Sequence, residues 1–495
     1  MSWITDNKDS APWTLTKKDW SGDKSLINIP KSAANNQYNE GHKITTLGEP
    51  VWTLDQSGVA ITEGHNPCGV WNARPDAPEP EVNLFDLIFT QQSASKQITL
   101  PLVAEDTGGV YDFTVNWGDG SSDHIVISTD PAVTHTYDSD DLYTITITGQ
   151  IEEIYLADFT ELIAWGPLIL VDRTSYFASD YWLTVSATDV PDLSRLIDAD
   201  NFFSRCYELT EVPNIDQWEV ATVESMNHFF NQCQKFNGDL DSWDVSKVTS
   251  MERMFYECYL FNSELNSWDV SKVGNFVNTF GKSRIFNQPL DSWDTSSALN
   301  LDHMFYNALL FNQNINDWDV SNVLNMTSVF HDAEAFNQPL NKWDTSKVTT
   351  MSSMFQDADK FNQSVSSWNV SNVTNMFLMF GGYGTGVFDQ SLVGWDTSKV
   401  TSMVGMFRGQ TSFDQDLSSW DFTSIVGSGL SNFIYRCPMS VTNYSNLLIS
   451  MASQDVNSNV TFSGTRSKYS VGVATTARDY LVNDKNWSID DGGQE

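Results

Sequence analysis

The sequence contains few cysteines, few basic residues and no long apolar segment. Only 5 of its 495 residues are Cys, too few for a disulfide framework in a chain of this length. It has no run of about 18 or more apolar residues, so no stretch predicts a membrane-spanning helix. Lys and Arg number 27 against 64 Asp and Glu, which gives a formal net charge of −37. Because nucleic-acid-binding faces are basic, we expect no nucleic-acid partner.

Motifs typical of enzymes and of metal-binding proteins are also missing. The 7 histidines show no HExxH spacing and form no motif with cysteine, and the chain contains no GxSxG or phosphate-binding loop. We therefore expect a protein that is not an enzyme, with no catalytic and no cofactor-binding residues. His303 and His331 interrupt repeated positions, and we expect both to face solvent rather than to bind a ligand.

Tryptophan recurs at a nearly fixed interval in the second half of the chain. From Trp218 the spacing is 25 residues six times, then 27, then 25, and a phenylalanine column keeps the same step. A period of this length is typical of stacked arrays in which each unit covers the apolar face of the next. We predict a solenoid over 213–430 and a buried column of repeat-core residues, the alternative being a row of sugar-stacking platforms: Trp243, Trp268, Trp293, Trp318, Trp343, Trp368, Trp395 and Trp420.

One repeat, from Trp243 to Phe261, predicts a short strand, a short helix and a turn. WDVS alternates apolar and polar residues, so Trp243 and Val245 are expected to face one side. VTSMERMFYEC has apolar residues at helical spacing, with Thr249 or Ser250 placed to cap the helix. Because strands stack about 4.8 Å apart and helices need roughly 8–10 Å, such coils predict a curved array with the strands on its inner face.

An acidic column follows the tryptophans. In-register carboxylates would repel one another unless something compensates their charge. Three roles are open to them: accepting hydrogen bonds in Asx-type turns, binding calcium between coils, or forming a polar strip for a ligand. Asn369 occupies the same position in another coil and favours the first role, because it keeps the hydrogen bond without the charge. The candidate calcium ligands are Asp244, Asp269, Asp294, Asp319 and Asp344.

Two further columns contain small side chains. The asparagine that follows each Phe, from Asn237 to Asn362, belongs in a turn, and we expect it to form a ladder there, with surface recognition as the alternative. Cys206, Cys233 and Cys258 share a position that later coils fill with Ser or Ala. This exchange predicts a packing position for small residues rather than a metal site or disulfides.

Units such as FNQPLDSWDTSS, separated by VTxMxxMF, resemble the BspA-like surface-protein repeats, an atypical leucine-rich-repeat family. The resemblance covers about 200–430. It implies a leucine-rich-repeat-like fold and a surface protein of bacterial or viral origin, several members of the family being linked to adhesion. The segment 443–493 resembles the module that often closes such arrays, and physics also requires a distinct cap on an open core end.

A second resemblance lies upstream. WGDG at 117–120, HTY at 135–137 and the alternating YTITITG resemble a PKD-type immunoglobulin-like β-sandwich. That family implies a spacer or interaction module, and Asp119 is expected to be a turn carboxylate. The predicted organisation is an N-terminal anchoring module (1–82), a PKD-like sandwich (83–150), degenerate adaptor coils (151–212), a curved α/β solenoid of 25-residue coils (213–430) and a C-terminal cap (431–495).

These domains together predict a non-enzymatic virion surface protein, for capsid decoration or a tail fibre. The N-terminal segment lacks the basic and apolar stretches of a secretory signal, and virions leave the cell by lysis. Residues 1–82 would contact other virion proteins, and the solenoid would bind a host glycan or protein, with homo-oligomerisation possible. The alternatives are a bacterial cell-surface or secreted adhesin and a carbohydrate-binding or carbohydrate-active protein.

Overall fold

The computed structural model describes residues 86–495, apart from 94, 103–110, 152–153, 155–158, 167, 172–175 and 384–385, together with five short strands before residue 86. The chain divides into two compact units, Met1–Glu81 and Val82–Glu495. In the first unit β1 (Ser2–Thr5) pairs with β2 (Leu15–Lys18), and β4 (Trp52–Leu54) lies between β3 (Lys43–Ile44) and β5 (Ala60–Ile61). The anchoring module predicted over 1–82 otherwise lies outside the described residues.

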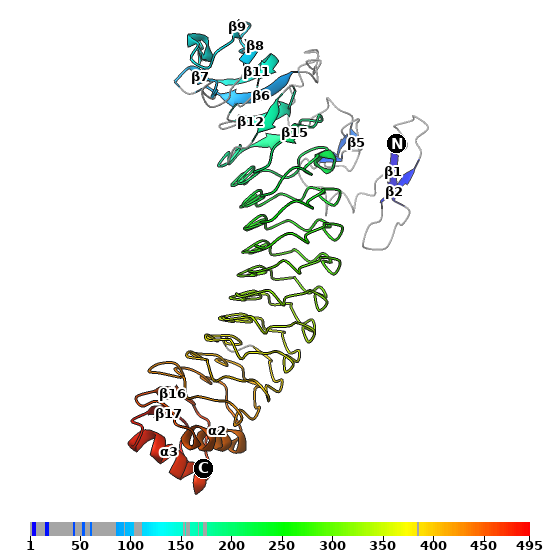
Figure 1. Ribbon diagram of the computed structural model, residues 1–495. Helices are drawn as coiled ribbons and strands as arrows, with labels where there is room; N and C mark the ends of the chain where they lie inside the picture. Colours follow the sequence, from blue (N-terminus) through cyan, green and yellow to red (C-terminus); the bar gives the residue numbers. More distant parts are fainter. Residues whose placement is uncertain are drawn as a thin grey trace. The chain divides into compact units, whose positions relative to one another are not determined.

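A six-stranded sheet opens the second unit (Figure 1). The alternating stretches predicted as strands are β8 (Tyr111–Asn116) and β11 (Leu142–Ile151), and the residues on their inner faces, Val115, Ile145 and Ile147, are fully buried. A two-stranded sheet of β7 (Gln97–Thr99) and β10 (Thr134–Thr136) accompanies it, with a 3-10 turn at Pro131–Val133. The order in the large sheet is β14 (Thr184–Val185), β12 (Phe159–Ala164), β6 (Leu87–Gln92), β11 (Leu142–Ile151), β8 (Tyr111–Asn116) and β9 (Ser122–Ile125).

This sheet continues past residue 150, where the sequence suggested a domain boundary. β12 pairs antiparallel with β6, and the rings of Phe159 and Phe89 stack with centroids 3.8 Å apart. β14 pairs parallel with β12, as β13 (Ile169–Val171) does with β15 (Asp192–Arg195). The strand pairing therefore changes from antiparallel to parallel within the segment predicted to adapt the sandwich to the array.

Consecutive coils then stack through single parallel bridges. These bridges run without a break from Asp198 through Ser225 and Ser250 to Ser402. Within a coil the backbone N–H groups alternate between two partners: Phe230 N–H donates to the Met254 carbonyl of the next coil at 3.0 Å, whereas Asn231 N–H donates back to His228 at 3.1 Å. Figure 1 shows the coils following one another in single file through the green and yellow part of the chain.

The predicted helix and strand of each coil are wrong. Between Gln217 and Val441 the described residues contain no helix and no strand, and the stretch predicted as helical consists of turns. His228 and Gln232 have φ of 59° and 63°, and the same two positions are left-handed in Arg253 and Glu257. Two left-handed residues in five cannot continue an α-helix. Apolar residues three and four positions apart can also point into the core from successive turns, so their spacing does not distinguish these turns from a helix.

Ring stacking explains why the coils exclude helices. Phe230 and Phe255 stack with centroids 5.9 Å apart, and Trp243 and Trp268 stack at 6.4 Å with their planes 2° apart. Packed helices need roughly 8–10 Å between axes, so coils at this spacing have no room for one helix each. The curvature inferred from a helical outer face therefore loses its basis.

Among the described residues, α-helices appear only after the last tryptophan of the stack, Trp420. α2 (Val441–Ser453) begins at the cap Ser440 and buries Leu447, Leu448 and Met451. Gln454, which ends this helix, donates to the Trp420 carbonyl at 2.7 Å and accepts from the Phe422 N–H at 2.8 Å. These bonds satisfy the backbone of the last coil. α3 (Val473–Asn483) contacts α2, and β16 (Thr461–Ser463) pairs parallel with β17 (Ser488–Asp490).

No helix in the described part of the chain is both long enough and apolar enough to cross a membrane.

Candidate functional site

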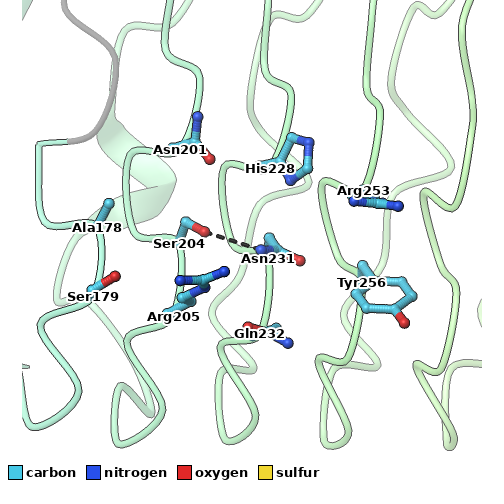
Figure 2. Close-up of a pocket in the computed structure, with 10 residues that line it drawn as sticks. All are labelled: Ala178, Ser179, Asn201, Ser204, Arg205, His228, Asn231, Gln232, Arg253 and Tyr256. Atoms are coloured by element: carbon cyan, nitrogen blue, oxygen red, sulfur yellow. Dashed lines mark hydrogen bonds between the residues drawn. The ribbon is translucent and has the colours of Figure 1, made fainter.

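A polar pocket lies on the face of the stack formed by the turn segments (Figure 2). Its volume is about 420 Å³. It is lined by side chains two residues before, one residue after and two residues after the stacked phenylalanines. These residues are Ala178, Ser179, Asn201, Ser204, Arg205, His228, Asn231, Gln232, Arg253 and Tyr256.

The pocket exists because one column of this face changes size. Ala178, Ser204 and Asn231 occupy successive coils with small side chains, and the Asn231 Nδ2 donates to the Ser204 Oγ at 3.0 Å. Tyr256 follows and forms an aromatic wall. Its ring lies over Gly281, where an added Cβ would come within 2.9 Å of Tyr256 Cδ2. Small residues on one side and a glycine on the other therefore leave a hollow beside Tyr256.

Two arginines give the pocket a positive character. Arg205 and Arg253 are exposed, and among the described residues neither has a carboxylate oxygen within 4.0 Å. The Arg253 guanidinium lies 5.6 Å from the centroid of the Tyr256 ring, a cation–π distance. The coil between the two arginines contributes His228 and Gln232. Burial lowers the pKa of His228, and Arg253 adds to this effect.

Carboxylates surround the pocket without lining it. Glu252 lies 4.0 Å from His228 Nε2, and Glu257 accepts from the Gln232 Nε2 at 2.9 Å. Glu257 also pairs with Lys282 at 2.5 Å, so its charge is already compensated. The pocket can thus offer cationic and amide donors to a ligand while its acidic neighbours have partners of their own.

The predicted tryptophan column lies in the core rather than on this surface. All eight indoles, from Trp243 to Trp420, are at most 3% exposed. Each indole N–H donates to a backbone carbonyl of the preceding coil, for example Trp268 to Leu240 at 2.8 Å. Rings placed in this way have no free face on which a sugar could stack.

The predicted aspartate column lies on the exposed surface, and its members form Asx turns. Each Oδ1 accepts the backbone N–H of the serine two residues later, at 2.9–3.1 Å. Asn369 makes the same bond to Ser371 at 3.1 Å. The bonds from Ser246 lower the pKa of Asp244. The structure does not bring Asp244, Asp269, Asp294, Asp319 and Asp344 into a cluster of ligand geometry within the described residues.

The asparagine column forms a ladder between coils. Asn312 Oδ1 accepts the backbone N–H of Asn337 at 2.9 Å, and Asn337 Oδ1 accepts that of Asn362 at 2.9 Å. The cysteine column is buried and its thiols are free. Cys233 and Cys258 each donate to a phenylalanine carbonyl of the preceding coil, as the Ser283 hydroxyl does.

One group of residues could hold a metal ion among those that the structure describes. The ligand atoms of His331, Asp332 and Asp357 lie within 4.8 Å of one another, and all three side chains are half-buried. Only 21% of the His331 side chain is exposed, so the expectation that it faces solvent is wrong. Burial lowers the pKa of His331 to about 4, whereas burial and then Asp357 raise that of Asp332 to about 6.

Asp119, in the turn after β8, forms a polar cluster that is not a catalytic relay. Its pKa is lowered to about 2 by hydrogen bonds from Ser121 and then from His135. The His135 Nε2 lies 2.8 Å from Asp119 Oδ2 and 3.3 Å from Ser121 Oγ. A relay needs the two nitrogens of the ring to contact the acid and the nucleophile separately, and here one nitrogen contacts both.

Sequence reasoning missed Arg205, Arg253 and Tyr256. Their positions differ in every coil, so they form no repeated column. The step from Phe203 to Phe230 is 27 residues rather than 25, which hides the alignment of Asn201, His228 and Arg253. The one available signal was the presence of two arginines near the start of the repeats in a chain with few basic residues.

Comparison with known proteins covers the coil stack. Residues 174–293, 275–386 and 383–446 match the family model described as "Mycoplasma protein of unknown function, DUF285", a repeat family related to the BspA-like surface repeats. No curated protein and no solved structure matches the chain. The matched segments together span 174–446, more than half of the 495 residues. The chain therefore belongs to the DUF285 repeat family.

Proposed function

We propose that this protein is a non-enzymatic surface protein of a virion. The exposed face of its coil stack would mediate adhesion. One observation carries the proposal. Core positions repeat from coil to coil, whereas the solvent-accessible column of Arg205 continues as Gln232, Glu257 and Lys282. A stack with a uniform core can change its exposed side chains at little cost to stability, as binding surfaces of repeat proteins require.

We further assign the coils to an atypical leucine-rich-repeat-like solenoid and residues 83–150 to a PKD-type immunoglobulin-like spacer. The unbroken chain of parallel bridges from Asp198 to Ser402 supports the first assignment. The antiparallel pairing of β6, β8, β9 and β11, together with the separate β7–β10 pair, supports the second. An experimental structure of 82–495 with the sheet folded as a two-layer sandwich would establish the spacer.

Localisation tests the proposal directly. Antibodies against the C-terminal helices would be used for immunogold labelling of purified virus particles and of intact host or bacterial cells. We expect label on particles, and cross-linking on those particles is expected to join residues 1–82 to other virion proteins. Label confined to the cell exterior would instead establish a bacterial surface adhesin, and label found only inside cells would overturn both proposals.

Carbohydrate binding is the second candidate function, and the pocket beside Tyr256 favours it. Its lining is polar and combines hydroxyl, carboxamide and guanidinium groups, which are the groups that pair with sugar hydroxyls and carboxylates. A glycan array probed with and without calcium tests it. Binding that survives calcium removal would place recognition in these side chains, whereas silence in both conditions would contradict a carbohydrate ligand.

A further inference from the structure

We propose that the pocket between Ala178 and Tyr256 binds an acidic saccharide, a glycan unit that carries a carboxylate, through Arg205 and Arg253. This inference rests on the proposed adhesion function and names the ligand class for it. The argument uses the charge of the pocket, the chemistry of its lining and the character of its surroundings.

The charge of the pocket is opposite to that of the chain. The chain carries 64 acidic against 27 basic residues, yet no Asp or Glu lines this pocket and two Arg do. Arg205 and Arg253 have no ion-pair partner among the described residues. Guanidinium groups match carboxylates with paired hydrogen bonds, so the ligand is expected to supply the missing negative charge.

The remaining lining favours a sugar over an apolar or purely ionic ligand. Asn201, Asn231 and Gln232 present carboxamides, which both donate and accept, and Ser179 and Ser204 add hydroxyls. Sugar hydroxyls also donate and accept, so they can satisfy such groups. The Asn231 Nδ2 already bonds Ser204, which fixes the orientation of its amide. A volume of about 420 Å³ lies within the roughly 300–1,000 Å³ of small-molecule sites.

Tyr256 and its neighbours restrict the ligand further. The ring of Tyr256 supports the Arg253 guanidinium at 5.6 Å from its centroid and so holds it at the pocket wall. Glu252, near His228, and Glu257, bonded to Gln232, lie just outside. Lys282 compensates the charge of Glu257, but the Glu252 carboxylate, in a chain of charge −37, would repel a long polyanion. A short saccharide with isolated carboxylates is therefore favoured over a sulfated polymer or a nucleic acid.

Binding of defined sugars to the full-length chain tests the proposal. N-acetylneuraminic acid and methyl glucuronide would be compared with the methyl esters of both and with inorganic phosphate, by saturation-transfer NMR and calorimetry. We expect the acids to bind at least ten-fold more tightly than their esters and phosphate to bind no better than the esters. Equal binding of acid and ester would overturn the proposal, and so would phosphate binding as tight as that of the acids.

Substitutions localise the binding. Arg253→Gln and Arg205→Gln are each expected to weaken acid binding at least ten-fold. The matched control is Arg408→Gln, because Arg408 also lies over a tyrosine, 5.2 Å from the Tyr383 centroid, but outside the pocket. Equal loss in the control would overturn the assignment, and circular dichroism of each variant excludes unfolding.

The results also separate this inference from the adhesion proposal. If the protein is found only inside cells but binds acidic sugars through its arginines, the adhesion proposal is contradicted and the proposed binding site is supported. A surface protein that binds no acidic sugar would contradict the site alone.

Discussion

The indole N–H of Trp343 donates to the backbone carbonyl of Ile315, one coil earlier, at 3.0 Å. The ring is 2% exposed, so this bond forms where water cannot replace it. Equivalent bonds join Trp318 to Leu290 and Trp368 to Leu340, each at 2.9 Å. The tryptophan column therefore stabilises the stack in two ways, by ring packing and by giving a backbone carbonyl of the preceding coil a second donor, as Ile315 also accepts the Trp318 N–H.

Replacing Trp343 by Phe should cost more than replacing Trp218. Trp343→Phe removes one of the two donors to the Ile315 carbonyl, which keeps only the Trp318 backbone N–H at 3.3 Å. The loss of one such hydrogen bond costs about 0.5–1.5 kcal/mol. Trp218 is equally buried, but its Nε1 has no hydrogen-bond partner, so Trp218→Phe removes an unsatisfied donor and should destabilise less. Urea unfolding followed by circular dichroism gives the comparison. An equal loss in both variants would show that packing alone determines the cost.

The asparagine ladder predicts which substitutions the turn accepts. Asn337 Oδ1 accepts from the Asn362 N–H at 2.9 Å and from the Gln363 Nε2 at 3.0 Å. Asn337→Ala should therefore cost about 1–2 kcal/mol. Asn337→Asp should be nearly neutral, because Asp389 already fills this position and accepts from the Asp414 N–H at 3.0 Å. Thermal unfolding of both variants tests this, and an Asp variant as unstable as the Ala variant would contradict the role of the acceptor oxygen.

The repeat, its period and its polar ladders could be read from the sequence, but the local backbone could not. Met251, Met254 and Phe255 fit the spacing of a helix and equally that of successive turns. The choice depends on the distance between coils, which ring stacking sets near 6 Å, as between Trp343 and Trp368 at 6.2 Å. The distance between coils depends on contacts between repeats, so it cannot be inferred from the sequence of one repeat.

The pocket escaped sequence reasoning for a related reason. Repetition reveals what coils share, and the pocket consists of what they do not share. Tyr256 forms a wall only because Asn231 before it and Gly281 after it are small. Searching each column for its exceptions, rather than for its rule, would have indicated these residues.

His331 and Asp332 predict opposing pH dependences of stability. The pKa of Asp332 is about 6 against an ordinary 3.8, so the folded state binds the proton more tightly and stability falls as pH rises from about 4 to about 6. The pKa of His331 is about 4 against an ordinary 6.5, so stability falls as pH decreases from about 6.5 to about 4. Between about pH 4 and pH 6, the two groups therefore change the stability of the folded state in opposite directions.

Single variants should separate the two effects. His331→Gln should leave a chain that loses stability as pH rises from about 4 to about 6, because burial, and then Asp357 and Glu334, still raise the pKa of Asp332. Asp332→Asn should produce the opposite slope, because burial, and then His303, still lower the pKa of His331. Melting temperatures measured across pH 4–7, relative to the parent chain, test the signs. Parallel curves for the two variants would contradict both assignments.

The turn after β8 offers a test of steric fit at glycine. Gly118 and Gly120 both have positive φ, at 82° and 94°, so alanine is strained at either position by about 1–2 kcal/mol. An added Cβ on Gly118 would also lie 2.5 Å from the Thr144 carbonyl oxygen, whereas one on Gly120 would meet nothing within 4 Å. The turn cannot easily move away, because Tyr137 Oη donates to the carbonyl of the buried Trp117 at 3.0 Å. Gly118→Ala should therefore destabilise the sheet by about 3 kcal/mol or more, the range of severe single substitutions.

Hydrogen exchange measures this locally, without interference from the coils. Peptides covering β8 and β9 should lose protection in Gly118→Ala by a factor of a hundred or so, since about 1.4 kcal/mol corresponds to a ten-fold change. Gly120→Ala should lose protection by roughly thirty-fold at most, and peptides from the coil stack should not change in either variant. Similar losses of protection in the two variants would mean that backbone strain, and not the contact with Thr144, determines the cost of alanine in this turn.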